Sequence, residues 1–404
     1  MNNPQAGSCT RETPGQPTTR PCGCPWHSSL FNASLACTGM RTRPAPGSTI
    51  VIKVGSSSLA GAGGGLDEAA VDRVVSQVEG VWGKGHPTVL VTSGAVAAGL
   101  PVMGAERPGD LAGLQVAAAV GQGRLMERYA TQFGARDRVV GQVLLTRDVL
   151  ARREQYLHAR EALQRMLGLG IVPIVNENDT VVVDELKLGD NDRLAAIVAH
   201  LVSAAMLIIL TDTAGLYSDD PDLSDDAELL TAVRHTDEIL DQLLRGSGSG
   251  ALGSGGVATK ISAARMAAWS GIPTVIAAAF DETAAVGAVS GENVGTWIEP
   301  HDSKLTAKKL WIAFGLPAAG RLIVDAGAIA ALKEHGGSLL PAGVTGVEGE
   351  FAAGSAVEVV AADGSLLGKG LAGLSATELR AALGRHSSQA GGEAIHRDDL
   401  VVLV

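Results

Sequence analysis

TIVIKVGSSS, residues 49–58, is the stretch that decides the fold: an apolar, β-branched run that ends in a glycine and three serines. An uninterrupted apolar run of this length is typical of a strand buried on both faces, as in a parallel sheet. Lys53 lies inside the run, where a lysine is costly unless its ammonium group reaches a polar site. The stretch predicts a central strand that brings Lys53, Gly55 and Ser56 to a functional sheet edge; a lysine that merely reaches solvent is the simpler alternative.

Similar runs recur along the chain and alternate with helical periodicity. The predicted strands cover 49–54, 88–92, 139–146, 171–175, 206–210 and 274–277. The predicted helices cover about 66–82, 111–133, 148–169, 193–203 and 257–270. This βαβ alternation predicts an α/β fold: a three-layer αβα sandwich around a mostly parallel sheet. After residue 308, short β-like runs and glycine-rich turns predict a small, mostly β domain at the C-terminus.

The predicted organisation has an N-terminal extension at 1–47, an α/β domain at 48–300, a linker at 301–316 and the small β domain at 317–404. The extension lacks periodicity, is rich in Pro, Thr, Gly and Ser, and contains all four cysteines of the chain. We therefore expect it to be disordered. The spacing of its cysteines does not match a known zinc finger. Translation from Met40 is an alternative that would leave only a short tail.

Composition excludes several classes of function. The 404 residues carry a net charge of −11 and only 3% aromatic residues, which argues against non-specific binding of nucleic-acid backbones and against base-stacking platforms. The longest apolar run, 201–210, is too short to span a bilayer. Residues 48–404 contain no cysteine, so this part has neither a disulfide nor a thiolate nucleophile. A reducing cytoplasm is the expected location, with no membrane partner.

Several common catalytic motifs are missing as well. The chain has no G-x-x-x-x-G-K-[ST], no G-x-G-x-x-G after the first predicted strand and no G-x-S-x-G with a credible histidine partner. Its nine histidines form no cluster with metal-ligand spacing. The remaining residues indicate anion chemistry without a general base.

Polar turns follow four of the predicted strands. Besides the turn after Lys53, Ser93-Gly94-Ala95 follows the second strand, residues 176–179 follow the fourth, and Thr211-Asp212 follows the fifth. Ligands of open α/β sheets bind at the carboxyl ends of the strands. Each cluster alone could be an ordinary turn. Four of them predict a shared site.

Lys260 is the second basic candidate. It follows the glycine-rich stretch 246–256 and falls in the first turn of a predicted helix, so the stretch could wrap phosphates, although a flexible surface loop is the alternative. Asp190, Asn191 and Asp192 belong to a tight Gly-Asp-Asn-Asp sequence. Its two acids could hold lysines in place, ligate magnesium or simply cap a helix.

Two lysines, glycine-rich backbone donors and acidic residues together suit phosphoryl transfer, which depends on positioning and on charge neutralisation. A carboxylate acceptor would already be ionised at neutral pH, since its pKa is about 4.3. No catalytic base is then needed, and the lack of a histidine or cysteine candidate is expected.

Seven ordered segments carry a resemblance to a known family: IVIKVGSSSL, VTSGAVAAG, VGQ–LLTRDV, IVPIVNEND, KLGDND, LTDTAGLY and GSGGVATK. Together they resemble the amino acid kinase family, most closely its branch that phosphorylates the side chain of glutamate. The segments AAGRLIVDAGAIAAL, GSLLPAGVTGVEGEF and AIHRDDLV resemble the PUA domain of the longer bacterial members. The resemblance covers nearly all of residues 49–404.

The resemblance implies the reaction: ATP and L-glutamate give ADP and L-glutamyl 5-phosphate with Mg²⁺, the first step of proline biosynthesis. It also implies feedback inhibition by proline, assembly into a homo-oligomer (a dimer or tetramer), and a glutamyl-phosphate reductase as a partner enzyme.

The resemblance also implies roles for individual residues. Lys53 and Lys260 would stabilise the transferring phosphoryl group, and Asp192 would hold both lysines. The glutamate site would comprise Ser93, Asp179, Asn191 and Asn176. The ATP site would comprise Lys53, Gly55, Ser56, Thr211, Asp212, Ser254, Gly255, Gly256, Val257, Ala258, Thr259 and Lys260. Asp190 would help to place magnesium or the substrate.

Three alternatives remain. A kinase for another small carboxylate, such as N-acetylglutamate, would not need Asp179 as the partner of a substrate ammonium. An RNA-binding protein would use the PUA-like domain, but residues 317–404 lack a basic patch, Trp and Tyr. An inactive regulatory pseudokinase would not need both lysines and both acids. The stretch 384–393 is shorter than is usual for the PUA domain, and Val257 stands where the family usually has Met.

Overall fold

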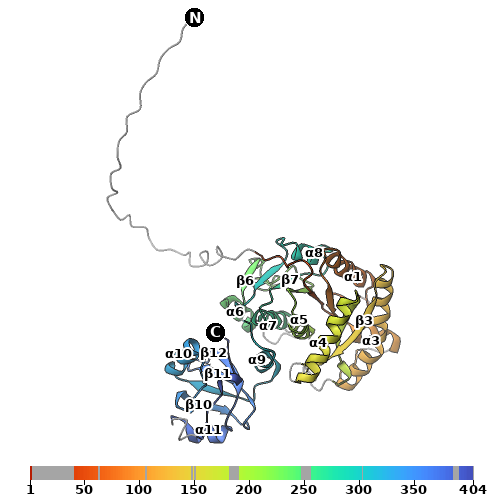
Figure 1. Ribbon diagram of the computed structural model, residues 1–404. Coiled ribbons are helices and arrows are strands. Elements are labelled where there is room, and N and C mark those ends of the chain that lie inside the picture. The colour runs from red at the N-terminus through yellow and green to blue at the C-terminus, as the bar shows by residue number, and fades with distance from the viewer. Residues whose placement is uncertain are drawn as a thin grey trace. The chain divides into compact units, whose positions relative to one another are not determined.

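The structure is a computed structural model that describes residues 1, 41–61, 64–104, 107–146, 149, 152–181, 191–246, 256–302, 304–384 and 391–403. These residues form two β-sheets, one of eight strands and one of five. Figure 1 shows the larger sheet with helices around it and the smaller sheet near the C-terminus.

The larger sheet has its most buried strands at its centre. Its strands are β1 (Ile50–Val54), β2 (Thr88–Val91), β3 (Val140–Leu145), β4 (Val172–Glu177), β5 (Met206–Thr211), β6 (Ala232–Arg234), β7 (Thr274–Ala278) and β8 (Thr296–Glu299). Their order is β3-β4-β2-β1-β5-β7-β8-β6, and every neighbouring pair is parallel except β7 and β8. Every residue of β1 is buried. The prediction of a mostly parallel sheet with a central strand at 49–54 is confirmed.

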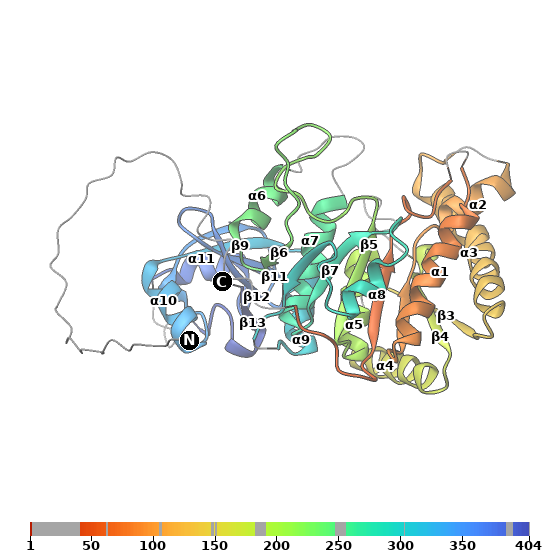
Figure 2. The ribbon, with the colours of Figure 1, turned by 90° about the horizontal axis from the view of Figure 1, so that it is seen from above.

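Helices cover both faces of this sheet (Figures 1 and 2). They are α1 (Glu68–Gly83), α2 (Ala95–Met103), α3 (Leu111–Gly134), α4 (Arg153–Gly168), α5 (Asn191–Val202), α6 (Glu238–Gly246), α7 (Gly256–Trp269) and α8 (Ala284–Val289). Helices α1, α3 and α8 pack against one another on one face, and α4, α5, α6 and α7 on the other. The predicted three-layer arrangement is confirmed.

Successive residues of β1 enter two different hydrophobic cores. Ile50 and Ile52 pack with α1, α3 and α8, whereas Val51 packs with α5 and α7. This alternation follows from the two-residue period of a strand. Complete burial of one such side chain contributes about 1.5–3 kcal/mol. The unbroken apolar sequence of β1 therefore reflects a strand with helices above and below it.

Helices α2 and α3 approach each other unusually closely. A Cβ atom added to Gly99 of α2 would overlap the backbone of Ala117, and one added to Gly121 of α3 would overlap that of Ala95. Only glycine permits backbones to approach this closely. The crossing fixes the position of Gln122, the next residue of α3, beside the carboxyl end of β4.

The smaller sheet contains β9 (Gly320–Val324), β10 (Val344–Gly349), β11 (Ala356–Ala361), β12 (Leu366–Leu371) and β13 (Leu400–Val402), in the order β10-β9-β11-β12-β13. Helices α10 (Ala326–His335) and α11 (Ala376–Ala382) accompany it. Leu322, Val357 and Leu379 belong to its separate core. The predicted small, mostly β domain is confirmed.

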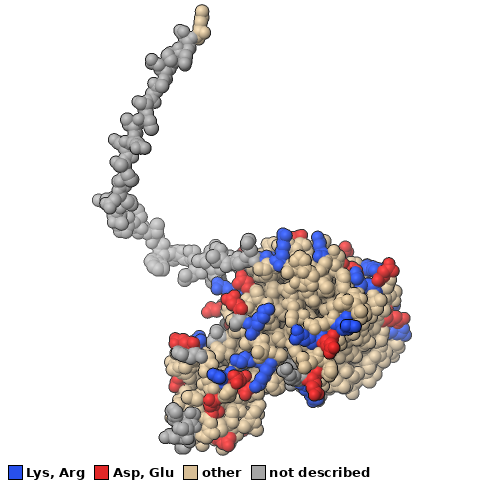
Figure 3. Space-filling model, in the orientation of Figure 1, with Lys and Arg blue, Asp and Glu red and all other residues tan. Residues whose placement is uncertain are grey.

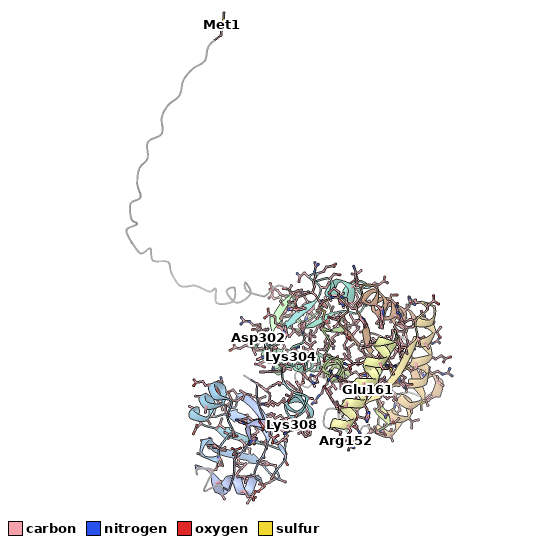
Figure 4. The ribbon with its side chains drawn as sticks, viewed as in Figure 1. Met1, Arg152, Glu161, Asp302, Lys304 and Lys308 are labelled. Carbon is pink, nitrogen blue, oxygen red and sulfur yellow. The ribbon has the colours of Figure 1, made fainter. Side chains whose placement is uncertain are left out.

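The connection between the two sheets contains α9 (Ala307–Leu310) and a π-helical turn, η3 (Trp311–Gly315). It carries Asp302, Lys304 and Lys308, which Figure 4 labels. The Lys308 ammonium lies 2.5 Å from a carboxylate oxygen of Asp399. On the face drawn in Figure 3, basic and acidic side chains are interspersed.

Some elements differ from the sequence-based expectations. Helix α5 begins at Asn191, two residues before the predicted start, and the short strands β6 and β8 were not predicted. These strands have three and four residues, too few to show a period of their own. The sequence also predicts a β-ribbon at 181–188, between the fourth strand and the Gly-Asp-Asn-Asp sequence; of these residues the structure describes only Val181, which ends the 3₁₀ turn η2 (Asp179–Val181). In the described part of the chain, no helix combines the length and apolarity that a bilayer crossing requires.

Candidate active site

The strand register brings the predicted polar turns to one edge of the larger sheet. Lys53 of β1 pairs with Val91 of β2, which in turn pairs with Val175 of β4. On the other side of β1, Val54 pairs with Leu210 of β5. The residues that follow these positions along each strand therefore lie at a common edge, as the sequence predicts.

Four side chains at this edge form an ionic cluster: Lys53, Asp192, Thr259 and Lys260. The Lys53 ammonium lies 2.5 Å from Oδ1 of Asp192, and the Lys260 ammonium lies 4.0 Å from Oδ2. The Thr259 hydroxyl donates a hydrogen bond of 2.7 Å to Oδ2. One carboxylate thus joins the central strand β1 to the first turn of α7, and the predicted contact of Asp192 with both lysines is present.

Burial makes this cluster electrostatically strong. The side chains of Lys53 and Asp192 are only 5% and 4% exposed. Although burial by itself would raise the pKa of Asp192, the charges of Lys53 and Lys260 and the hydrogen bonds from Lys53 and Thr259 lower it below its ordinary value. Asp192 is therefore a carboxylate at neutral pH, and it holds two positive charges at the sheet edge.

Lys260 is held less tightly than Lys53. Its ammonium donates a 3.0 Å hydrogen bond to the carbonyl of Gly256, at the start of the same helix, and its side chain is 14% exposed. A lysine ammonium is a mobile point charge on a flexible stem. Lys260 can therefore follow an anion that enters at the N-terminus of α7, where backbone N–H groups also favour negative charge.

Two buried carboxamides and a half-buried one form a second group, the amide chain: Asn176, Asn191 and Gln122. Asn191 donates from Nδ2 to Oδ1 of Asn176 at 2.7 Å, and Asn176 donates from Nδ2 to Oε1 of Gln122 at 2.8 Å. Asn191 Nδ2 also lies 3.0 Å from the Ser93 hydroxyl and 2.6 Å from the carbonyl of Thr92. Asn191 thereby contacts two other predicted glutamate-binding residues, Ser93 and Asn176.

A cavity of about 310 Å³ opens beside the amide chain. Gln122 of α3 and Asp179 of η2 both line it. Its other lining residues come from α3, β3 and the end of β4: Ala118, Ala119, Gly123, Gln142, Leu144, Glu177, Asn178 and Thr180. The volume is at the lower end for small-molecule pockets, which suits a ligand the size of an amino acid. Asp179, the fourth predicted glutamate-binding residue, therefore lines a cavity that reaches the amide chain at Gln122.

The predicted nucleotide-binding residues outside the ionic cluster lie at the same sheet edge. Gly55 and Ser56 follow β1, and Ser56 is exposed. Thr211 ends β5 and donates a 2.9 Å hydrogen bond to the exposed Asp212. Gly256, Val257 and Ala258 form the first turn of α7. Ser254, Gly255 and Asp190 fall outside the described residues.

Comparison with known proteins places the chain in a family. Residues 48–278 match the amino acid kinase family, and residues 320–390 match the PUA domain. A protein of Frankia casuarinae named glutamate 5-kinase is 47% identical over 365 residues, which are 88% of this chain and 96% of that protein. Proteins of the same name from Marinomonas sp. and Cutibacterium acnes are 43% and 46% identical, cover 90% and 88% of this chain, and are themselves covered over 100% and 91% of their lengths.

The chain belongs to the glutamate 5-kinase branch of the amino acid kinase family. A UMP kinase structure from Bacillus anthracis matches 65% of this chain and 99% of its own length, at 13% identity and a TM-score of 0.45, too weak a likeness to add to this assignment. The family implies ATP as a substrate.

The structure places further residues at the cavity and the amide chain that the sequence did not indicate. Gln122 was not predicted, although it completes the amide chain and lines the cavity. Gln142 and Glu177 also line the cavity and were not singled out. Gln142 and Leu144 are alternate residues of β3, and this is the only signal in the sequence that could have placed them on one face.

Proposed function

We propose that this protein transfers the γ-phosphoryl group of ATP to the side-chain carboxylate of L-glutamate, and so forms L-glutamyl 5-phosphate and ADP, the first step of proline biosynthesis. The observation that carries the proposal is the buried Asp192 carboxylate, which holds Lys53 and Lys260 beside the amide chain. The match to proteins named glutamate 5-kinase over nearly their full length supports the choice of reaction.

The reaction needs charge stabilisation rather than proton transfer. An oxygen of the glutamate side-chain carboxylate forms a bond to the γ-phosphorus, the bond from that phosphorus to the bridging oxygen breaks, and its electron pair leaves with ADP. The nucleophile is ionised at neutral pH, so no proton has to be removed. Lys53 and Lys260 stabilise the negative charge on the transferring group, while Asp192 keeps both ammonium groups in position.

Recognition of the acceptor falls to the amide chain and the cavity. We assign the substrate ammonium to Asp179, whose carboxylate is almost buried and carries the complementary charge. Ser93, Asn176 and Asn191 are neutral hydrogen-bonding groups that orient the substrate without repelling its carboxylates. Charged groups thus serve the phosphoryl group, and neutral groups mainly serve the acceptor.

The described residues assigned to ATP follow the same sheet edge as the ionic cluster: Gly55 and Ser56 after β1, Thr211 and Asp212 after β5, and Gly256, Val257 and Ala258 in the first turn of α7. Mg²⁺ would neutralise phosphate charge and be held chiefly by the phosphate oxygens themselves. The described residues fit this arrangement. Both carboxylate oxygens of Asp192 already face the lysines or Thr259, and the described residues contain no group of three potential metal ligands. Asp190, outside those residues, is the candidate for a protein contact.

An acyl-phosphate trapping assay tests the activity. Purified protein, MgATP and L-glutamate are incubated with hydroxylamine, and hydroxamate is measured against controls with N-acetylglutamate and L-aspartate. We expect hydroxamate with L-glutamate alone. Product only with N-acetylglutamate would move the specificity within the same fold, and no product with any acceptor would contradict the proposed activity.

Regulation, assembly and location also belong to this proposal. Inhibition by proline is testable in the same assay. Assembly into a homo-oligomer is supported by exposed apolar side chains on the edge strand β3 and on α3, namely Leu144, Val116 and Val120. A glutamyl-phosphate reductase as partner, a cytoplasmic location, RNA binding by the PUA domain and the domain boundaries after residues 47, 300 and 316 stay predictions.

A further inference from the structure

Gln122 is the one member of the amide chain that the family resemblance did not select. It lies on α3, directly after Gly121, whose close approach to α2 fixes its position. Its Oε1 accepts the 2.8 Å hydrogen bond from Asn176, and among the described residues its buried Nε2 has no partner. Gln122 also lines the cavity that contains Asp179. The side chain therefore touches both the buried hydrogen-bond network and the space for the acceptor.

Backbone groups determine which way the asparagine carboxamides point. The N–H of Glu177 donates to Oδ1 of Asn176 at 2.9 Å, and the carbonyl of Thr92 accepts from Nδ2 of Asn191 at 2.6 Å. A backbone N–H can only donate and a backbone carbonyl can only accept. The Asn176 amide must therefore present its nitrogen to Gln122, and Gln122 must meet it with an oxygen.

The same reasoning fixes the free atom of Asn191. Because its nitrogen faces Thr92, Ser93 and Asn176, its Oδ1 points elsewhere, and this buried oxygen has no hydrogen-bond donor among the described residues. A buried acceptor without a donor is costly, so a substrate donor that reaches this oxygen would be bound favourably. The amide chain thus keeps one acceptor oxygen available at the carboxyl edge of the sheet.

We infer that Gln122 is a positioning residue for the acceptor amino acid: its oxygen holds the Asn176 carboxamide, which holds Asn191 with Oδ1 turned toward a donor group of the substrate. This inference rests on the proposed function and deepens it. Without the Gln122 oxygen, Nδ2 of Asn176 becomes an unpaired buried donor, and the Asn176 amide is held only through its Oδ1. The acceptor for Asn191 is then held less firmly, and part of the binding free energy of the substrate is spent on ordering the site.

The role predicts a selective change in the requirement for L-glutamate. Gln122→Leu keeps a similar volume but removes both polar atoms, so we expect the KM for L-glutamate to rise about tenfold, the size of effect that one lost buried hydrogen bond produces. The KM for ATP and kcat should stay close to those of the wild type, because the ionic cluster is untouched. The matched control is Gln132→Leu, on the same helix but outside the cavity lining, where Gln132 contacts Arg136.

Gln122→Glu separates positioning from simple packing. The introduced carboxyl group keeps an oxygen for Asn176 but replaces Nε2 and adds a negative charge near Asp179 and Glu177. Burial and these neighbours raise the pKa of such a group above its ordinary value of about 4.3. We therefore expect Gln122→Glu to raise the KM for L-glutamate above that of the wild type. This increase, measured against the wild type at the same pH, should be larger at about pH 8 than at about pH 6.

Three results would overturn the role: an unchanged KM for L-glutamate in Gln122→Leu, a parallel rise in the KM values for both substrates, or, if that variant does not fold, a Gln122→Glu increase that is independent of pH. Stabilisation of the protein by L-glutamate in a thermal melt gives a readout without turnover. If the wild type forms no acyl phosphate but is stabilised by L-glutamate, the proposed activity fails. Loss of that stabilisation in Gln122→Leu would still support the positioning role, and its retention would refute it.

Discussion

Asp192 of the ionic cluster and Asn191 of the amide chain are adjacent in the sequence, yet the first group is built mainly from charged side chains and the second from neutral amides. Asp192 holds two ammonium groups, whereas Asn191 holds a hydroxyl, a backbone carbonyl and a second amide. Both groups lie at the carboxyl edge of the same sheet. Under the proposed function, the start of α5 thus divides the site: it places charge beside the transferring phosphoryl group and neutral dipoles beside the acceptor.

The two groups also differ in what they cost the fold. A buried ion pair loses much of its attraction to the desolvation of both charges, and removal of one partner typically destabilises a protein by about 3–5 kcal/mol. A buried amide–amide hydrogen bond contributes only about 0.5–1.5 kcal/mol. Loss of one member should therefore destabilise the fold more in the ionic cluster than in the amide chain.

The largest effect is expected from the loss of a charge in the ionic cluster. Lys53→Met keeps the apolar stem of the side chain and removes the ammonium that faces Asp192. We expect kcat to fall by about 10²–10³, as for other losses of one transition-state donor, and stability to fall because Asp192 loses its nearer partner. Hydroxamate formation at saturating substrates and urea denaturation measure the two effects. A kcat within tenfold of the wild type would contradict the division of roles.

An intermediate effect, of a different kind, is expected on the acceptor side. Asp179→Asn keeps the shape of the residue and removes the negative charge that we assign to the substrate ammonium. The KM for L-glutamate should rise by about 10–100-fold, since a buried charged hydrogen bond is worth about 1.5–3 kcal/mol, with a much smaller change in kcat. Initial rates over a range of L-glutamate concentrations test this expectation. A variant that loses kcat but not affinity would place Asp179 with the ionic cluster instead.

The third expectation concerns the pH dependence of stability. Titration of Asp192 should change the free energy of unfolding little near neutral pH and strongly in acid. The pKa of Asp192 is lowered in the folded state, so its contribution to stability is present above the unfolded-state pKa of about 3.9 and is lost as the pH falls through the folded-state value. The amide chain does not titrate. The free energy of unfolding of the wild type should therefore fall more steeply below about pH 4 than that of Asp192→Asn. Parallel curves from urea titrations at several pH values would show that Asp192 does not carry this acid dependence.

The sequence was enough to predict the centre of the larger sheet, because strands buried on both faces must be apolar along their whole length. It also pointed to Lys53, because a lysine inside such a strand needs a polar site, and to Asp192, because the acids of the Gly-Asp-Asn-Asp sequence could hold lysines in place. β6 escaped prediction because its three residues owe their strand conformation to pairing with β8 rather than to a pattern of their own.

Gln122 could not have been found in this way. It lies within the long helical pattern at 111–133, where a glutamine among alanines and glycines reads as an ordinary partly exposed position. Its role depends on the distance between α2 and α3, which is set by Gly99 and Gly121, and on Asn176, which lies more than fifty positions further along the chain. A contact of that kind belongs to the tertiary packing, not to any local period.

Arg41, which precedes β1, bears on how the fold responds to salt concentration. Its guanidinium donates to four backbone carbonyls, those of Thr231, Glu292, Val294 and Gly295, rather than to a carboxylate. Dissolved salt screens the attraction between two surface charges but weakens hydrogen bonds to uncharged carbonyls much less. A lysine has only three donors and lacks the planar fork, so it could not replace this arginine. These hydrogen bonds tie the segment that leads into β1 to the residues just before β6 and β8, and we expect them to persist in concentrated salt.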